Sequence, residues 1–208
     1  MTCDAVVLGI PFTTLRDVEL DGSLNLPPWK RDAIDLLGYG TNAKMMVGFD
    51  GRPWVDLGSS DESYSDLGHH QLTWESNPVN ATSARAVLTD YASGDRGAGL
   101  NPNNTQSEAS FFLGDLDRVF AGASAAASRD SQGKLRAHLE HWPLNPLTKG
   151  RYTCYTPGQF TSIAGNEGKP VGRVYFAGEH ANSFYEWQGF MEGAALSGIQ
   201  AAHRFYAT

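Results

Sequence analysis

The chain has 208 residues, of which 41% are hydrophobic and 19% are charged, an ordinary composition for a globular protein with a sizeable core. Its formal net charge is −7 and it contains no basic run, which argues against a nucleic-acid partner. No apolar run approaches the roughly 20 residues that a transmembrane helix needs, so we expect no membrane partner.

The N-terminus and the cysteines indicate the cellular compartment. The first ten residues, MTCDAVVLGI, lack the charged segment and the long apolar core of a signal peptide. Cys3 and Cys154 are the only cysteines in the sequence, and two free thiols in a reducing compartment are favoured over a disulfide. We therefore predict a cytoplasmic protein.

The first predicted elements are a strand and a short helix. Residues 4–10 form a nearly continuous apolar run closed by Pro11, the pattern of a strand buried on both faces, as in parallel sheets. Residues 27–37 predict a helix with proline in its first turn. Its inner side is expected to carry Trp29, Ala33, Leu36 and Leu37.

Residues 42–49 predict a half-buried strand, because apolar side chains occupy every second position. The core-facing residues are Ala43, Met45, Val47 and Phe49. Lys44 points the other way, toward solvent or a cavity. A single lysine on a strand is usually just solvated, so alternation alone gives it no function.

The middle of the chain predicts short strands at residues 70–76 and 84–92 and a helix over residues 105–122. Thr105 and Glu108 have the spacing of a capping box. The apolar stripe of this helix comprises Phe112, Leu116, Val119 and Phe120. The adjacent histidines at 69–70 lack the spacing of paired metal ligands, so we predict a solvated loop there and no metal site. A strand over residues 134–142 and a loop over 143–165 follow.

The C-terminal part predicts a buried strand over residues 171–179 that ends in Gly178 and Glu179. Helix character begins at Gln188, and glycine and alanine recur along the helix, so it can lie very close to a sheet or to a flat ligand. The free N–H groups of its first turn would suit an anionic or electron-rich ligand edge. A tightly packed terminal helix without a ligand fits the pattern equally well.

The stretch YFAGEHANSFYEWQGFMEGAALSGIQAA, residues 175–202, resembles the C-terminal FAD-binding signature of the flavin-containing amine oxidases, the superfamily of monoamine oxidase and L-amino-acid oxidase. This resemblance implies an FAD cofactor. The cofactor-binding residues that it implies in this stretch are Gly178, Glu179, Gln188, Gly189, Phe190, Met191 and Ala194.

Other segments resemble the same family. The segment GYGTNAKMMVGFDGRPW is similar to the one that carries the family's lysine near flavin N5, so Lys44 is the implied catalytic residue. The segment HWPLNPLTKGRYTCYTPGQFT resembles the loop that carries a tryptophan beside the flavin ring, here Trp142, which is thus an implied cofactor contact. The implied substrate-binding residues are Tyr152, Trp187 and Phe190. Arg151 stands where monoamine oxidases attach the flavin to a cysteine, so noncovalent FAD is implied.

The resemblance also implies the fold and its division. We expect an α/β fold, with an α+β substrate domain built on a mixed sheet and with the closing strand and helix of an FAD-binding Rossmann-like domain. Residues 1–12 would form the strand that returns to the FAD-binding domain, and residues 13–150 the substrate-binding domain. Residues 151–208 would form the aromatic loop and the C-terminal FAD-binding strand and helix.

A motif that usually accompanies this signature is absent from the sequence. No G-x-G-x-x-G motif opens a βαβ unit here, and the resemblance covers only the C-terminal half of the family's chain. We therefore expect a hetero-oligomer, in which a second polypeptide supplies the N-terminal FAD-binding half.

The implied reaction oxidises a small-molecule amine to an imine and reduces O2 to H2O2. Two alternatives stay open. One is an L-amino-acid oxidase, in which Arg151 or Arg173 would bind the substrate carboxylate. The other is a non-catalytic interaction module derived from the family.

Overall fold

The computed structural model describes residues 3–77, 84–182 and 187–207, and the chain divides into two compact units. Unit 1 comprises Met1–Gly40 and Leu144–Thr208, and unit 2 comprises Thr41–Pro143. The expected boundaries at residues 12 and 150 divide the chain by function. They differ from the boundaries of these two units, which divide it by internal contacts. The functional division stays a prediction.

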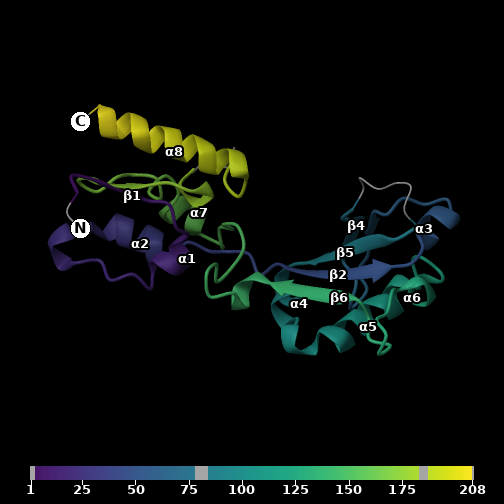
Figure 1. Ribbon diagram of the computed structural model, residues 1–208. Coiled ribbons are helices and arrows are strands. Elements are labelled where there is room, and N and C mark those ends of the chain that lie inside the picture. The colour runs from purple at the N-terminus through teal and green to yellow at the C-terminus, as the bar shows by residue number, and fades with distance from the viewer. Residues whose placement is uncertain (1–2, 78–83, 183–186, 208) are drawn as a thin grey trace. The chain divides into compact units, whose positions relative to one another are not determined.

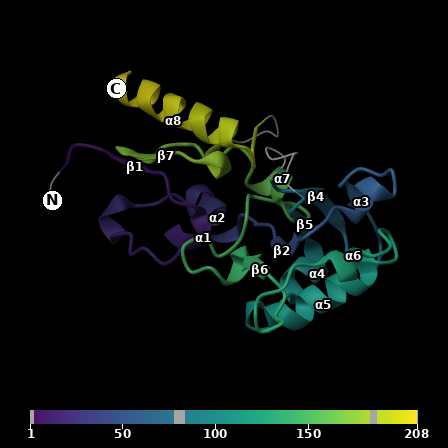
Figure 2. The same cartoon turned by 45° about the vertical axis from the view of Figure 1, so that its right-hand side comes forward.

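Unit 1 is layered around a pair of parallel strands, β1 (Val6–Leu8) and β7 (Val174–Phe176) (Figure 1). Because side chains alternate along β7, Tyr175 packs toward α8 (Met191–Tyr206) and Phe176 packs toward the opposite side. The opposite side holds α1 (Phe12–Leu15) and α2 (Pro28–Leu36), as Figure 2 also shows. The shorter elements are η1 (Gly22–Leu24), α7 (Gln159–Ser162) and η5 (Glu179–Ala181).

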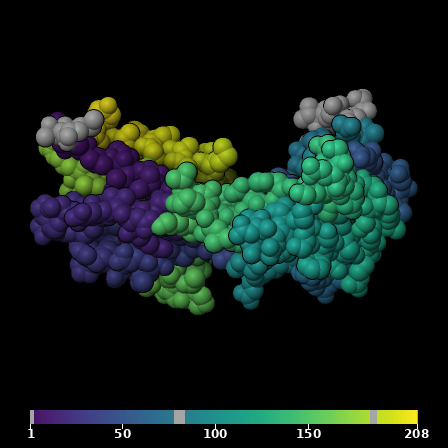
Figure 3. Space-filling view, turned by 60° about the horizontal axis from the view of Figure 1, so that its bottom comes forward, coloured from purple at the N-terminus to yellow at the C-terminus, as the bar shows by residue number. Residues whose placement is uncertain are grey.

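The structure confirms the parallel pairing of the first strand but not its burial. Val6 and Val7 are 39% and 54% exposed, and Ile10 is 40% exposed. The physical reason is that β7 is the one strand that pairs with β1 among the described residues. Figure 3 shows the purple N-terminal segment at the surface beside the yellow α8, where Ala5 packs against the cluster around Tyr175.

The expected inner face of α2 is wrong in two positions. Trp29 and Leu36 are 36% and 54% exposed. The helix instead buries Lys30, Ala33 and Ile34, and Leu37 is buried at its C-cap. These four positions have the i, i+3, i+4, i+7 spacing of one helix face, and a search for apolar residues misses this face because it includes a lysine.

Unit 2 is a five-stranded sheet in the order β3-β4-β5-β2-β6, and all pairings of its described strands are antiparallel. The strands are β2 (Ala43–Phe49), β3 (Ser63–Tyr64), β4 (Leu72–Glu75), β5 (Ala86–Ala92) and β6 (Ala137–His141). The helices are α3 (Pro53–Asp56), α4 (Gly94–Gly99), α5 (Thr105–Leu116) and α6 (Ala123–Ala126), with the 3-10 helices η3 (Pro102–Asn104) and η4 (Trp142–Leu144). The α/β class is confirmed, although the sheet of unit 2 is antiparallel rather than mixed.

The core of unit 2 lies between the sheet and α5. Burial along β2 alternates strictly, with Met45 and Val47 buried and Lys44 half-buried, as the sequence predicts. The helix α5 is shorter than expected and ends at Leu116. The expected capping box is wrong, because the Thr105 hydroxyl donates to the Pro102 carbonyl (2.7 Å).

Candidate flavin and amine site

In unit 2, Lys44 projects from the face of β2 that lies opposite the core. Its neighbours across the sheet are Tyr91 on β5 and Glu140 on β6. The ammonium nitrogen lies 5.3 Å from the ring centroid of Trp74 and 5.7 Å from that of Trp142. Each contact has cation–π geometry, which stabilises such a group by about 0.5–1 kcal/mol at partly exposed sites. The two indoles therefore restrict where the ammonium can lie.

The structure brings together two predicted residues, Lys44 and Trp142, and adds Trp74 to them. Trp74 belongs to the predicted strand at residues 70–76, but the sequence does not give the register of that strand. Trp74 pairs with Thr89, which in turn pairs with Met46, so Trp74 shares the sheet face of Lys44. The sequence carries no local signal for this register, because the buried residue before Trp74 is the polar Thr73.

In unit 1, the closing strand β7 leads to Gly178, whose backbone φ of +129° favours glycine. A Cβ at this position would lie 2.4 Å from the His180 ring, so the close approach also requires glycine. The Gly178 N–H donates to the Ser197 hydroxyl (2.8 Å), and the same hydroxyl donates to the Gly178 carbonyl (2.9 Å). One side chain of α8 thus fixes the end of β7 against the helix.

The Glu179 carboxylate joins two other segments. Its Oε1 accepts from the Thr153 N–H (3.1 Å), and its Oε2 accepts from the Thr153 hydroxyl (2.7 Å) and from the Gly189 N–H (2.8 Å). Hydrogen bonds to a charged acceptor contribute about 1.5–3 kcal/mol each. Because Tyr152 precedes Thr153 and Phe190 follows Gly189, Glu179 holds the backbone beside two of the predicted substrate-binding residues.

The three predicted substrate-binding residues of unit 1 are all partly exposed aromatic side chains. Tyr152, Trp187 and Phe190 are 39%, 41% and 61% exposed. The rings of Trp187 and Phe190 meet edge to face, with centroids 6.2 Å apart and planes at 85°. The backbone of Gly189 packs against the Tyr152 ring, because a Cβ there would lie 3.5 Å from its Cδ2. All three side chains therefore gather around the turn that precedes α8.

The predicted helix begins at Met191 rather than at Gln188, since Gln188 and Gly189 lie in the preceding turn. The N-cap residue Phe190 offers no capping side chain, and among the described residues no other side chain accepts from the first N–H groups of α8. Met191 is 91% exposed at this end. A Cβ on Gly193 would lie 2.0 Å from the Trp187 carbonyl oxygen, so glycine lets the helix approach this turn. Ala194 begins the intrahelical bonds, donating to the Phe190 carbonyl (3.3 Å).

Arg151 lies beside the Tyr152 ring, on the same loop as Tyr152. Its guanidinium carbon is 5.8 Å from the Tyr152 ring centroid, and its backbone N–H donates to the Gly40 carbonyl (3.0 Å). Cys154, three residues along the chain, is a free and exposed thiol. Arg173, the other cation considered for a carboxylate, is exposed and donates to the Asp4 carbonyl (3.4 Å), next to β1.

His180 has a structural environment. Its ring is 2% exposed and lies 4.5 Å from the Phe12 ring centroid. Burial, aided by the nearby charge of Lys30, lowers the pKa of His180 to about 4. The imidazole is therefore neutral at physiological pH and cannot carry a positive charge to a ligand.

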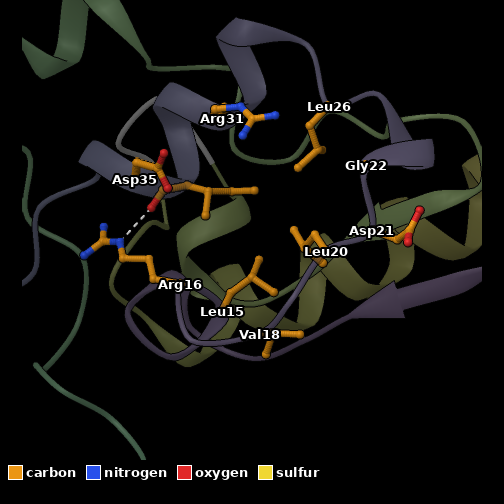
Figure 4. Close-up of a pocket in the computed structure, with 10 residues that line it drawn as sticks. Leu15, Arg16, Val18, Leu20, Asp21, Gly22, Leu26, Arg31 and Asp35 are labelled. Atoms are coloured by element: carbon orange, nitrogen blue, oxygen red, sulfur yellow. Dashed lines mark hydrogen bonds between the residues drawn. The ribbon is translucent and has the colours of Figure 1, made fainter.

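A separate cavity of about 210 Å³ lies between α1 and α2 in unit 1 (Figure 4). Its lining includes the apolar side chains of Leu15 and Ile34 and the basic residues Arg16 and Arg31. The Arg16 guanidinium donates to the Ile34 carbonyl (2.8 Å) and to the Leu37 carbonyl (2.7 Å), so it caps the C-terminal end of α2. The predicted site residues do not line this cavity.

Of the two adjacent histidines, His69 is exposed as expected for a solvated loop, whereas His70 is not. His70 is fully buried because it packs against Phe112 of α5. Its ring also shares a hydrogen bond with the Ser63 hydroxyl (3.0 Å). Burial lowers the pKa of His70, which disfavours the charged form of the ring. Across the parts of the chain that the structure describes, no cluster of three or more His, Cys, Asp or Glu side chains could hold a metal ion. Nor does any helix in those parts have the length and hydropathy to cross a bilayer.

Comparison with known proteins identifies the class to which this fold and site belong. Residues 1–205 match the model of a protein family described as flavin containing amine oxidoreductase. The chain belongs to this family, whose members bind FAD, and the resemblance drawn from residues 175–202 is thereby confirmed.

Individual relatives show the same relationship. The Bacillus subtilis (strain 168) protein named "Putative L-amino-acid oxidase YobN" is 28% identical over 205 residues, which are 97% of this chain and 41% of that protein. An L-amino-acid oxidase of Naja atra is 26% identical over 203 residues, 97% of this chain and 38% of that protein. The cyclohexylamine oxidase of Brevibacterium oxydans IH-35A shares the fold, with a TM-score of 0.80 at 22% identity over 97% of this chain and 42% of that one.

The chain thus spans about two fifths of the length of the relatives that it matches. The roles assigned to individual residues stay predictions. The structure gathers those of unit 1 around Glu179 and those of unit 2 around Lys44.

Proposed function

We propose that this chain is the C-terminal part of an FAD-dependent amine oxidase, which oxidises an amine to an imine while O2 is reduced to H2O2. The observation that carries the proposal is the hydrogen bonding of Glu179 to Thr153 and Gly189. It holds two partly exposed aromatic residues, Tyr152 and Phe190, beside an uncapped helix N-terminus.

The residues at this end of α8 fit a flat, electron-rich cofactor edge. The uncapped N–H groups and the positive end of the helix dipole suit such an edge. Met191 and Phe190 offer exposed apolar surface that a ring system would cover, and Gly189 keeps the approach free of a side chain. Glu179 would contribute mainly through its backbone and by holding the turn, since its carboxylate already accepts three hydrogen bonds.

Flavin supplies the redox chemistry when bound. This chain's residues would orient and desolvate the amine. Tyr152 and Phe190 would face the substrate with aromatic surface, which carries no fixed negative charge that would keep the amine protonated. Lys44 would act from its position between Trp74 and Trp142. Restricting its ammonium in advance lowers the entropy cost of placing it in the reaction.

The adenosine-binding part of the catalytic unit would come from a second polypeptide that carries the G-x-G-x-x-G motif. The exposed apolar residues of β1 support this proposal, because Val6 and Val7 stand on a strand with an unpaired edge among the described residues. An added strand would pair that edge and cover Val7. We expect an obligate, largely apolar interface of at least about 2,000 Å².

The test is to express this chain alone and together with the polypeptide that carries the motif. We expect a yellow, FAD-containing complex from co-expression, and an insoluble or flavin-free product from this chain alone. A soluble, FAD-loaded monomer of this chain would overturn the two-polypeptide proposal. A stable complex without flavin absorbance would overturn the oxidase and favour a non-catalytic interaction module.

An L-amino-acid oxidase is the second candidate, and one observation favours it. The Arg151 guanidinium lies beside the Tyr152 ring, where it could bind a substrate carboxylate, and two relatives are named as L-amino-acid oxidases. Turnover of L-amino acids and of the matching decarboxylated amines separates the candidates. If the amino acid is the substrate, Arg151→Met lowers its kcat/KM by about 100-fold and leaves the amine unaffected. If the amine is the substrate, the variant changes little.

A further inference from the structure

A buried lysine lies behind the turn that precedes α8. Lys30 is 0% exposed, although lysine is almost never fully buried unless its charge is paired. Its ammonium donates to the Asn166 carbonyl (2.6 Å) and to the Glu167 carbonyl (2.7 Å). It also lies 3.9 Å from the ring centroid of Phe176, the last residue of β7. Lys30 therefore joins α2, the 166–167 turn and the closing strand.

The polar contacts continue from this lysine to the predicted cofactor site. The Glu167 side chain is also 0% exposed, and its carboxylate accepts from the Tyr155 hydroxyl. The Tyr155 oxygen in turn accepts from the Gln188 side-chain amide (3.2 Å), which also reaches the His180 carbonyl (3.5 Å). Gln188 directly precedes Gly189, so the chain of contacts ends at the turn beside Phe190.

Charge links the two ends of this arrangement. The nearby Glu167 carboxylate raises the pKa of Lys30 and so favours its charged form, against the effect of burial. An ionised Glu167 is a strong acceptor for Tyr155, and this bond orients the hydroxyl so that its lone pair faces Gln188. Removing Lys30 would take the ammonium donor away from the Asn166 and Glu167 carbonyls and would loosen the 166–167 turn that carries Glu167.

We propose that Lys30 is a positioning residue that acts through Glu167 and Tyr155 to hold Gln188, and with it the turn at the N-terminus of α8. This inference rests on the proposed function for its consequence, because that turn is where FAD would bind. Lys30 itself lies behind the turn and touches neither cofactor nor substrate.

The test compares Lys30→Met with Lys169→Met in the co-expressed complex. Lys169 is the matched control, since it reaches the same turn from solvent, donating to the Asn166 side-chain oxygen (2.7 Å). We expect Lys30→Met to raise the dissociation constant of FAD about tenfold and to change the visible circular dichroism of the flavin. Lys169→Met should leave both unchanged.

A double-mutant cycle with Tyr155→Phe separates positioning from general destabilisation. If the residues act in series, the dissociation constant of FAD in the double variant is no higher than in the single variant that binds FAD less tightly. Fully additive losses would overturn the proposal, as would unchanged FAD binding and circular dichroism in Lys30→Met.

Hydrogen exchange gives a readout that does not need flavin. The backbone N–H groups of Gly189 and Phe190 are hydrogen-bonded, to Glu179 and to the Trp187 carbonyl. We expect Lys30→Met to speed exchange in the peptide spanning residues 187–194 by about fivefold, and Lys169→Met to leave it unchanged. If the wild-type complex holds no flavin, the proposed function fails, and this exchange rate alone decides whether Lys30 positions the turn. Equal exchange in all three proteins would then refute the inference.

Discussion

Burial makes Lys30 a pH reporter in unit 1. Desolvation lowers the pKa of its ammonium from 10.5 to about 7, an effect that the Glu167 carboxylate opposes and that Lys169 and Arg204 reinforce. We therefore expect Lys30 to titrate near neutrality, and Lys30→Met to abolish that titration. The unfolded chain keeps the ordinary lysine pKa, which couples this ionisation to stability.

The sign and size of the coupling follow from the two pKa values. Between pH 7 and pH 10.5 the unfolded chain binds more protons than the folded one, so the free energy of unfolding rises with pH. Below pH 7 Lys30 is protonated in both the folded and the unfolded chain, so the folded chain carries the full cost of burying its charge. The expected gain from pH 7 to pH 9 is about 2 kcal/mol, since each pH unit well inside this interval adds about 1.4 kcal/mol.

Two neighbouring groups limit the useful pH range. Burial raises the pKa of the Tyr39 hydroxyl, so its ionisation destabilises the fold only above about pH 10. His180 makes the free energy of unfolding depend on pH only below about pH 6.5, the pKa of histidine in the unfolded chain. The interval from pH 7 to pH 9 therefore isolates Lys30 from both of these groups.

The assay is carbon-13 NMR of the complex with this chain's lysines labelled at Cε. The chain has five lysines, and we expect one resonance to titrate near pH 7 and to be missing in Lys30→Met. Denaturation at pH 7 and pH 9 should then show about 2 kcal/mol more stabilisation in the wild type than in the variant. Five resonances that all titrate above pH 9.5, together with equal pH slopes, would refute the reasoning.

Three further predictions concern the site and its surroundings. Lys44→Met should leave folding and flavin content intact and slow turnover at least about tenfold, a loss of about 1.4 kcal/mol, and wild-type rates of flavin reduction and reoxidation would contradict this role. Acid or heat precipitation should release the FAD, because the family resemblance implies that Arg151 stands where monoamine oxidases attach the flavin; flavin that stays with the denatured chain on a gel would show a covalent bond. The free energy of unfolding of the wild type should fall by up to about 3 kcal/mol between pH 6.5 and pH 4, because His180 resists protonation until about pH 4 in the folded state. The variant His180→Leu should lose less over the same range, and an equal loss in both proteins would contradict this role of His180.

The elements that the sequence predicts well are those in which one local rule decides the outcome. The alternation of β2 separates Met45 from Lys44 because one face of its sheet packs on α5 and the other does not. The strand predicted before Gly178 is also present, although β7 spans only Val174–Phe176 and ends before Gly178 and Glu179. In these places the local pattern and the tertiary environment agree.

Other features depend on contacts between segments far apart in the chain. The register that brings Trp74 over Lys44 needs β4, β5 and β2 to be paired first. The inner face of α2 includes Lys30, which is tolerated there only because a turn 136 residues away supplies carbonyl acceptors. Neither contact has a local signal, so a propensity or periodicity argument cannot find it.

Glu179 shows how a motif residue can have a structural role beside an implied cofactor role. The family signature implies a cofactor contact, whereas the structure gives its carboxylate three donors from two segments. These descriptions are compatible, because the carboxylate fixes the backbone next to Tyr152 and Phe190 while the uncapped start of α8 stays available. A neutral side chain at this position would lose the charge that strengthens all three bonds, and the loop and the turn would no longer share one anchor. The proposed substrate-binding residues and the proposed cofactor-binding turn thus depend on the same carboxylate, so a change at Glu179 should alter both together.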